Sequence, residues 1–285
     1  MFTLHNGDCL QVMPTIPSGS IDMILCDLPY GQINSHWDKA LPISELWKEY
    51  QRVIKKSGAI LLFGIEPFSS MLRMSNINNY KHEWYWNKEV SGNFIQAKNH
   101  PMKVIENVLC FSFGKVNYYP IIENAKPENI RPQKESRQKS DFLGTVSNGV
   151  FIPKSDKNKR YPKNLITYNA RKGECNNVNR IHPTQKPVEL LQYLICTYTK
   201  EGETVLDNTM GSGSTIEAAE RTGRNSIGIE KDEGIFQTAV LRLRSLTPSN
   251  NRLHMDAGDS PRQTEFTQLE GFTPAEQGST PAPRQ

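Results

Sequence analysis

Cysteine is scarce in this sequence, and long hydrophobic runs are lacking. The five cysteines among 285 residues are odd in number and no two lie closer than seventeen positions, which argues against a disulfide framework or a Cys-x-x-Cys metal site. The longest nearly uninterrupted apolar run, 59–65, is far shorter than the roughly 20 residues of a membrane helix. The N-terminus has no basic region and carries Asp8 where a signal peptide would be apolar. We therefore expect a soluble, cytoplasmic protein without a membrane partner.

Metal-binding patterns are lacking as well. None of the six histidines has a partner at ligand spacing, so we expect no metal site. The length is sufficient to bury a sizeable core without disulfides or metals, and it is compatible with one large α/β domain.

The net charge of +4 is small but unevenly distributed. Residues 249–285 contain three Lys or Arg and five Asp or Glu, so residues 1–248 carry a net charge of +6. The segment 131–172 has eleven basic residues against three acidic ones, with aromatic residues between them. This composition suits a nucleic-acid surface, where cations neutralise phosphates and rings stack on bases, although a solvated loop can have the same composition. The candidates for nucleic-acid contact are Lys154, Lys157, Lys159, Arg160, Lys163, Arg171 and Lys172.

Apolar segments typical of strands and helices alternate in both halves of the chain. This alternation predicts βαβ units and a mostly parallel sheet, hence an α/β fold. In the first expected helix, Ser44 is a plausible N-cap and Gly58 follows as a terminator. After residue 248 no apolar periodicity is left, so we expect a disordered tail. Strands are expected at 21–25, 59–63, 81–86, 104–113, 203–206 and 225–229, and helices at 43–55, 67–74, 187–198, 215–221 and 232–244.

A glycine-bearing turn follows the expected strand at 203–206. Residues 207–215 read Asp-Asn-Thr-Met-Gly-Ser-Gly-Ser-Thr, and Glu230 closes the next strand. Such a turn lets backbone amides approach a ligand, and the later acid can accept hydrogen bonds from ribose hydroxyls. Ile216 replaces the third glycine of a dinucleotide fingerprint, and Asp207 would repel a pyrophosphate. These features favour a cationic nucleoside such as S-adenosylmethionine, although similar turns also occur for packing reasons alone.

The tetrapeptide Asp27-Leu28-Pro29-Tyr30 follows the buried strand expected at 21–25. At the carboxyl end of a strand in an open α/β sheet, side chains and carbonyls face the ligand crevice. A carboxylate and a backbone carbonyl held by Pro29 provide two acceptors, and Tyr30 provides a ring for stacking. These parts can hold an exocyclic amine. A simple turn that ends the strand would look the same in isolation.

Two shorter motifs complete the set: 6–8, Asn-Gly-Asp, and 182–187, His-Pro-Thr-Gln-Lys-Pro before an amphipathic helix. Taken together and in this order, the four motifs resemble those of the amino-specific DNA methyltransferases of the circularly permuted, beta-type order. In that group the catalytic motif precedes the target-recognition region and the cofactor motif follows it. The resemblance covers about residues 2–245. It departs from the commonest family pattern at Leu28, where Pro is usual.

The resemblance implies the methyltransferase fold that binds S-adenosylmethionine, with a seven-stranded, mostly parallel, circularly permuted sheet. Residues 1–90 would form the catalytic half and 181–248 the cofactor-binding half. Residues 91–180 would be a basic target-recognition region that includes core strands, and 249–285 the disordered tail.

The implied activity is methyl transfer from S-adenosylmethionine to the N6 amine of an adenine flipped out of double-stranded DNA. N4-cytosine methylation is an alternative, although that branch usually has Ser in place of Asp27, and a protein-glutamine methyltransferase would have Asn there. A catalytically inactive nucleic-acid-binding module is an alternative of another class. A cognate restriction endonuclease and a homodimer are both compatible with the family. The implied catalytic residues are Asp27, Leu28, Pro29 and Tyr30, and the implied cofactor-binding residues are Asp8, Thr184, Lys186, Asp207, Thr209, Gly211, Gly213 and Glu230.

Overall fold

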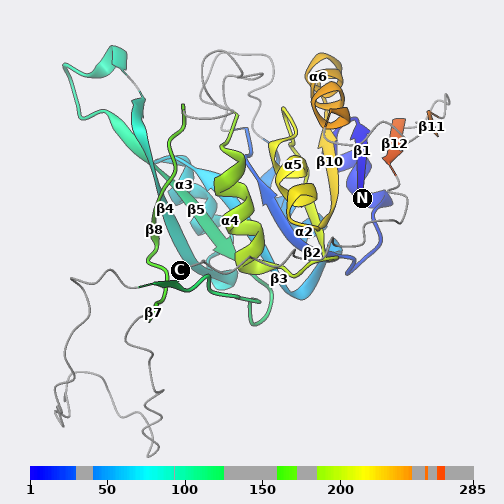
Figure 1. The fold of residues 1–285 in the computed structure, drawn as a ribbon, viewed down its shortest axis with the longest axis horizontal. Coiled ribbons are helices and arrows are strands. Elements are labelled where there is room, and N and C mark those ends of the chain that lie inside the picture. Colours follow the sequence, from blue (N-terminus) through cyan, green and yellow to red (C-terminus); the bar gives the residue numbers. More distant parts are fainter. Residues whose placement is uncertain are drawn as a thin grey trace, which may run out of the picture.

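A computed structural model describes residues 1–29, 41–92, 94–124, 159–171, 185–245, 254–255 and 262–266. Its central feature is a sheet whose seven core strands follow the order β1, β10, β9, β2, β3, β5, β4 (Figure 1). The first five run parallel, and β5 is antiparallel to both of its neighbours. This confirms the expected α/β class and mostly parallel sheet. The bounds are β1 Phe2–Asn6, β2 Ile21–Cys26, β3 Ile54–Gly64, β4 Tyr80–Gly92, β5 Lys103–Phe111, β9 Thr204–Asp207 and β10 Asn225–Glu230.

Further short strands extend this sheet at both edges. β8 (Leu165–Thr167) pairs parallel with β4, while β12 (Arg262–Phe266) pairs antiparallel with β1 and also with β11 (His254–Met255). A separate pair, β6 (Glu123–Asn124) and β7 (Lys159–Arg160), forms a second small sheet.

Helices cover both faces of the large sheet in Figure 1. Their bounds are α1 Cys9–Val12, α2 Ile43–Val53, α3 Phe68–Ser75, α4 Val188–Tyr198, α5 Ser214–Arg221 and α6 Glu233–Arg244. Short 3-10 helices lie at η1 Met13–Thr15, η2 Ile77–Asn79 and η3 Phe94–Gln96. Among the described residues, no helix is both long enough and apolar enough to span a bilayer.

The alternation of side chains along the buried strands explains this layering. Successive strand residues point to opposite faces, so a strand covered on both sides must be apolar throughout. On β2, Ile24 packs in the cluster that includes α1, α2 and α3, whereas Met23 and Leu25 pack with α4 and α5. All six residues of β2 are buried. This double coverage accounts for the short, almost continuous apolar strand in the sequence.

Several expected boundaries were wrong. The helix expected at 43–55 is α2. It ends at Val53 because β3 begins at Ile54, and its N-cap is Pro42 rather than Ser44. Gly58 lies inside β3 and does not terminate the helix. There, a Cβ would come within 2.7 Å of the Asp22 carbonyl oxygen. Gly58 is therefore required for the close approach of β2 and β3.

The expected disordered tail also needs correction for its described residues. β12 and β11 belong to 249–285, and β12 extends the sheet through its pairing with β1. β11 and β12 are short and have no apolar alternation, so the sequence does not indicate them as strands. β12 forms because the edge of β1 offers backbone groups for hydrogen bonding, and β11 pairs with β12 in turn. The rest of 249–285 lies outside the described residues.

Candidate active site

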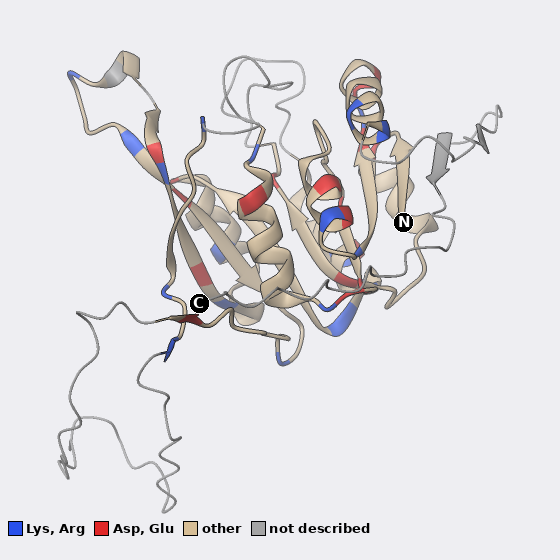
Figure 2. Cartoon of the chain, viewed as in Figure 1, with Lys and Arg blue, Asp and Glu red and all other residues tan. Residues whose placement is uncertain are grey.

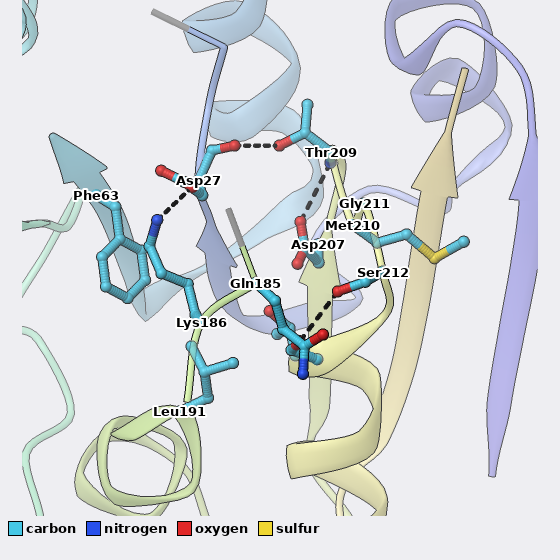
Figure 3. A pocket seen from close by; sticks show the side chains of 12 residues that line it. Asp27, Phe63, Gln185, Lys186, Leu191, Asp207, Thr209, Met210, Gly211 and Ser212 are labelled. Carbon is cyan, nitrogen blue, oxygen red and sulfur yellow. Dashed lines mark hydrogen bonds and ion pairs between the residues drawn. The ribbon is translucent and has the colours of Figure 1, made fainter. Parts of the chain in front are cut away.

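The carboxyl ends of β2 and β9 lie side by side and carry the two acidic motifs. Asp27 directly follows β2, and Asp207 is the last residue of β9. Thr209 links them: its hydroxyl donates to the Asp27 carbonyl oxygen at 3.1 Å, and its N–H donates to Asp207 Oδ1, also at 3.1 Å (Figure 3). Two motifs 180 positions apart in the sequence, at Asp27 and Asp207, thus form one edge of a single site.

The turn after β9 has the backbone conformation that its glycines permit. Gly211 and Gly213 have φ values of 51° and 77°, in the left-handed region where L side chains are disfavoured. A Cβ at Gly211 would meet nothing within 4 Å, so this glycine is explained by its backbone angle and not by crowding. α5 begins directly after Gly213, which is its N-cap.

Glu230, at the end of β10, is held by the backbone around it. Its Oε2 accepts the Gly211 N–H at 3.0 Å and its Oε1 accepts the Asp232 N–H at 2.8 Å. A carboxylate has about four acceptor positions, so this arrangement fixes the side chain while leaving acceptor capacity for a diol. Burial raises the pKa of Glu230 above its ordinary value, against the lowering effect of these amide hydrogen bonds.

Asp207 is the most perturbed carboxyl group of the cavity. Burial raises its pKa to about 7, while hydrogen bonds from Thr215 and the Thr209 amide act in the opposite direction and the charges of Asp27 and Glu230 add to the rise. A nearby positive charge would stabilise the ionised form of Asp207. The carboxyl ends of β2 and β9 therefore favour a bound cation over a phosphate, in agreement with the expectation from the sequence.

Lys186 reaches the same edge from the segment that precedes α4. Its Nζ lies 2.5 Å from Asp27 Oδ2 and 5.1 Å from the centre of the Phe63 ring (Figure 3). The same Nζ lies 3.5 Å from Oε2 of Glu106, whose Oε1 accepts from Lys88 at 2.9 Å. Burial would lower the pKa of Lys186, but the charges of Asp27 and Glu106 outweigh it and raise the pKa. Lys186 is therefore an ammonium.

A cavity joins Asp27, Lys186 and Asp207. Residues from the ends of β2, β3 and β9, from the glycine turn and from the start of α4 and α5 line it, and Figure 3 shows their side chains. The lining residues are Asp27, Phe63, Gln185, Lys186, Leu191, Asp207, Thr209, Met210, Gly211, Ser212, Ser214 and Thr215.

The other predicted site residues are placed less centrally or lie outside the described part of the chain. Leu28 is 3% exposed and packs in the core with α2, which accounts for an apolar residue at this position. Asp8 caps α1 through the Leu10 N–H and pairs with Lys231 at 2.8 Å. Tyr30, Thr184, Lys154, Lys157 and Lys172 lie outside the described residues.

The structure separates the described basic candidates. Lys159 and Arg160 form β7, whose partner β6 follows a segment bonded to the start of β3 (Asn117 N–H to the Ser57 carbonyl). β7 therefore lies at the end of the sheet opposite to Asp27 (Figure 1). Arg171 follows β8, which runs parallel to β4 and leads toward the end where the cavity lies. Lys163 lies just before β8. Figure 2 likewise shows basic positions at both ends of the sheet.

Glu106 and Lys88 were not predicted from the sequence. One signal for Glu106 exists: it interrupts the apolar run of β5, where a single acid on a buried strand needs a cation beside it. Its partner Lys186 could not be inferred, because no spacing rule joins positions 106 and 186.

The fold and the paired strand ends define an α/β enzyme with a ligand crevice at the carboxyl edge of its sheet. A family described as DNA methylase matches residues 21–241, and the chain belongs to this family.

Two relatives support this assignment. The chain is 27% identical over 276 residues to the Type II methyltransferase M.HinfI of Haemophilus influenzae, covering 89% of this chain and 71% of that protein. It is 28% identical over 261 residues to the DNA adenine methyltransferase YhdJ of Escherichia coli K12, covering 85% and 82% respectively.

Solved structures share the fold at lower identity. The M1.HpyAVI–SAM complex is similar with a TM-score of 0.55 at 21% identity, covering 85% of this chain and 100% of that one. The cytosine-N4-specific PvuII DNA methyltransferase has a TM-score of 0.59 at 15% identity, covering 87% of each chain.

Proposed function

We propose that this chain transfers a methyl group from S-adenosylmethionine to the N6 amine of adenine in double-stranded DNA. The observation that carries this proposal is the position of Asp27, which is joined through Thr209 to Asp207 and the glycine turn. One cavity therefore contains Asp27, which can accept from an amine, and Asp207, which suits a cationic nucleoside.

The residues around the turn fit S-adenosylmethionine. Glu230, fixed by two backbone amides, has acceptor capacity for the ribose hydroxyls. Asp207 lies buried where a positive charge would stabilise its ionised form. Gly211 and Gly213 allow the backbone to approach the ligand. When bound, the cofactor supplies an electrophilic sulfonium methyl group. We assign Asp8 and Thr184 to the same ligand by resemblance.

Asp27 and the Leu28 carbonyl act on the target amine. The N6 lone pair of adenine is delocalised into the ring, which makes the amine a poor nucleophile. Accepting its two hydrogens favours sp³ character at the nitrogen and frees the lone pair for the methyl group. Pro29 fixes the backbone that carries the carbonyl. This is positioning and electrostatic stabilisation rather than strong base catalysis.

The proton balance also involves Asp27. After transfer, the methylated nitrogen carries a positive charge and releases one proton to Asp27 or to water. Lys186 cannot receive that proton, because it is already an ammonium. Tyr30 would stack on the base, which has to leave the duplex to reach the cavity.

The choice of adenine rests on Asp27. The N4-cytosine branch usually has Ser at this position, and one relative is named as an adenine methyltransferase. N4-cytosine methylation remains the alternative, since its target is also an exocyclic amine.

Asp27→Asn tests the assignment while preserving size. We expect loss of methyl transfer to DNA, measured by mass spectrometry of digested DNA, and S-adenosylmethionine affinity close to that of the unmodified protein by calorimetry. Asp22→Asn is the matched control, because it removes the charge of a buried, ion-paired Asp on β2, the strand that Asp27 follows, and Asp22 does not line the cavity. This variant should retain transfer.

Three outcomes distinguish the proposed function from its alternatives. Retained turnover by Asp27→Asn would contradict the role of Asp27. A product of N4-methylcytosine from the unmodified protein would favour the alternative base. Cofactor binding with no modified base in any DNA would favour a nucleic-acid-binding module.

A further inference from the structure

Lys186 lies between two carboxylates in a nearly closed part of the molecule. Its Nζ is 2.5 Å from Asp27 Oδ2 and 3.5 Å from Glu106 Oε2, and only 12% of the lysine side chain is exposed. The Phe63 ring, 5.1 Å away, provides a π face beside the ammonium. The ammonium is therefore within reach of both carboxylates.

The ion pair between Lys186 and Asp27 competes with the target amine for the acceptor positions of Asp27. The target amine must donate to this carboxylate, and an ammonium at 2.5 Å already holds one of its oxygens. A buried ammonium that leaves its partner is strongly disfavoured unless another anion receives it. A base amine that takes the acceptor position now held by Lys186 therefore needs the ammonium to have a second acceptor within reach.

Glu106 has the properties of that acceptor. It is 8% exposed, and its Oε1 is held by Lys88 at 2.9 Å, while its Oε2 is buried and accepts no hydrogen bond from the described residues. This second oxygen is the one that faces Lys186. A buried carboxylate oxygen without a hydrogen bond is unfavourable, so moving the ammonium toward Glu106 gains a charge-assisted hydrogen bond as Asp27 loses one.

We propose that Glu106 is a positioning residue, which receives the Lys186 ammonium when the target amine binds to Asp27. Without DNA, Lys186 neutralises Asp27. With the base in place, Lys186 pairs with Glu106 and Asp27 accepts from the amine. This inference rests on the proposed function, because the competing ligand of Asp27 is the exocyclic amine.

The ionisation of Glu106 agrees with the proposed transfer of the Lys186 ammonium. Burial would raise the pKa of Glu106, but the charges of Lys186 and Lys88 lower it below its ordinary value. Glu106 is therefore ionised and able to receive the ammonium.

Glu106→Gln tests the proposal with little change in shape. Of the two carboxylates that pair with Lys186 in the described part of the chain, it leaves Asp27 alone. We therefore expect the single-turnover rate at saturating DNA and cofactor to fall about tenfold or more, with cofactor affinity within about twofold of the unmodified protein. Glu83→Gln is the matched control. Glu83 is an ion-paired, half-buried glutamate on the neighbouring strand β4, it pairs with Arg73, and its replacement should not change the rate.

The double-mutant cycle with Lys186→Met separates this mechanism from a purely structural role. If Glu106 acts through Lys186, then Glu106→Gln should have little further effect on the rate once the ammonium is gone. An equal loss in both backgrounds would overturn the proposal. So would an unchanged rate for Glu106→Gln.

Two further measurements keep the test decisive. Thermal unfolding of each variant shows whether folding is affected, and Glu106→Asp, which retains the charge, should recover part of the rate if Glu106→Gln proves unstable. No recovery by a folded Glu106→Asp would count against the proposal. Failure of the proposed function is distinguishable, because the unmodified protein would then give no N6-methyladenine at all.

Discussion

At the level of single residues, the buried carboxyl of Asp207 couples the site to pH. Its pKa is raised to about 7 by burial, so between about pH 4 and 7 the folded protein holds a proton that the unfolded chain has lost. The free energy of unfolding of the ligand-free protein therefore falls as pH rises through this window, because the folded state binds more protons there. A bound cation reverses the preference by stabilising the ionised form.

We therefore predict that S-adenosylmethionine affinity increases with pH up to about 7, by at most about tenfold per pH unit. Calorimetry from pH 5.5 to 8 should show this slope in the unmodified protein and a flat, weaker response in Asp207→Asn. Asp8→Asn is the control. The Asp8 pKa is lowered by Lys231 and the Leu10 amide despite the opposing effect of burial, so the carboxylate is charged throughout and the slope should persist. An identical slope in Asp207→Asn would contradict the prediction.

The residues that could be predicted share one property: each stands at or directly after the carboxyl end of a strand. Asp27, Asp207 and Glu230 follow this pattern, and parallel topology brings such ends to one edge. Glu106 and Lys88 lie within strands whose antiparallel pairing is a tertiary outcome, so local sequence carries no information on their partners. The contact between Lys186 and Asp27 spans 159 positions and was not predicted, although both residues were assigned to the site.

At the level of elements, Gly228 controls how β10 fits against the turn that follows β9. A Cβ at Gly228 would lie 2.4 Å from Met210 Sδ and 3.0 Å from Ile216 Cδ1. Met210 lines the cavity, and its flexible side chain is the group that would have to move. We predict that Gly228→Ala lowers the free energy of unfolding by about 1–3 kcal/mol through overpacking and also weakens cofactor binding.

Urea denaturation and calorimetry of the same preparations check this prediction. Ser226→Ala, two residues earlier on β10, is the matched control. Its hydroxyl is buried and has no hydrogen-bond partner among the described residues, so its removal should be close to neutral. Cofactor affinity unchanged by Gly228→Ala would show that Met210 can move without affecting the cavity.

The buried strands and the amphipathic helices were predictable as elements, while their limits were not. β2 and α4 follow from short apolar runs and helical spacing. Helix ends such as Val53 depend on where the next strand enters the sheet. A glycine after a helix does not by itself mark the helix end, because it can also permit close packing between strands, as Gly58 does. β8 and β12 consist of three and five residues that are strands only because an edge is available to them.

At the level of the whole molecule, the charge of the segment 131–172 cannot be treated as one surface. The described part of this segment passes along the sheet through β8, with β7 at the end opposite to the cavity and Arg171 toward the cavity end. Sequence composition reports the charge of a segment but not how its chain path divides that charge. Contact with DNA at Asp27 therefore favours Arg171 over Lys159 and Arg160.

We predict that Arg171→Ala weakens binding of double-stranded DNA and reduces the slope of log affinity against log salt concentration, by up to about 0.9 if one phosphate contact is lost. The exposed guanidinium of Arg171 can neutralise a phosphate, and phosphate contacts act on all sequences equally. The double variant Lys159→Ala/Arg160→Ala removes twice the charge from the opposite end and is the control. If its salt slope falls as much as that of Arg171→Ala, DNA also contacts β7, and the duplex must then reach both ends of the sheet. If only Arg171→Ala changes the slope, the duplex lies across the edge that carries Asp27.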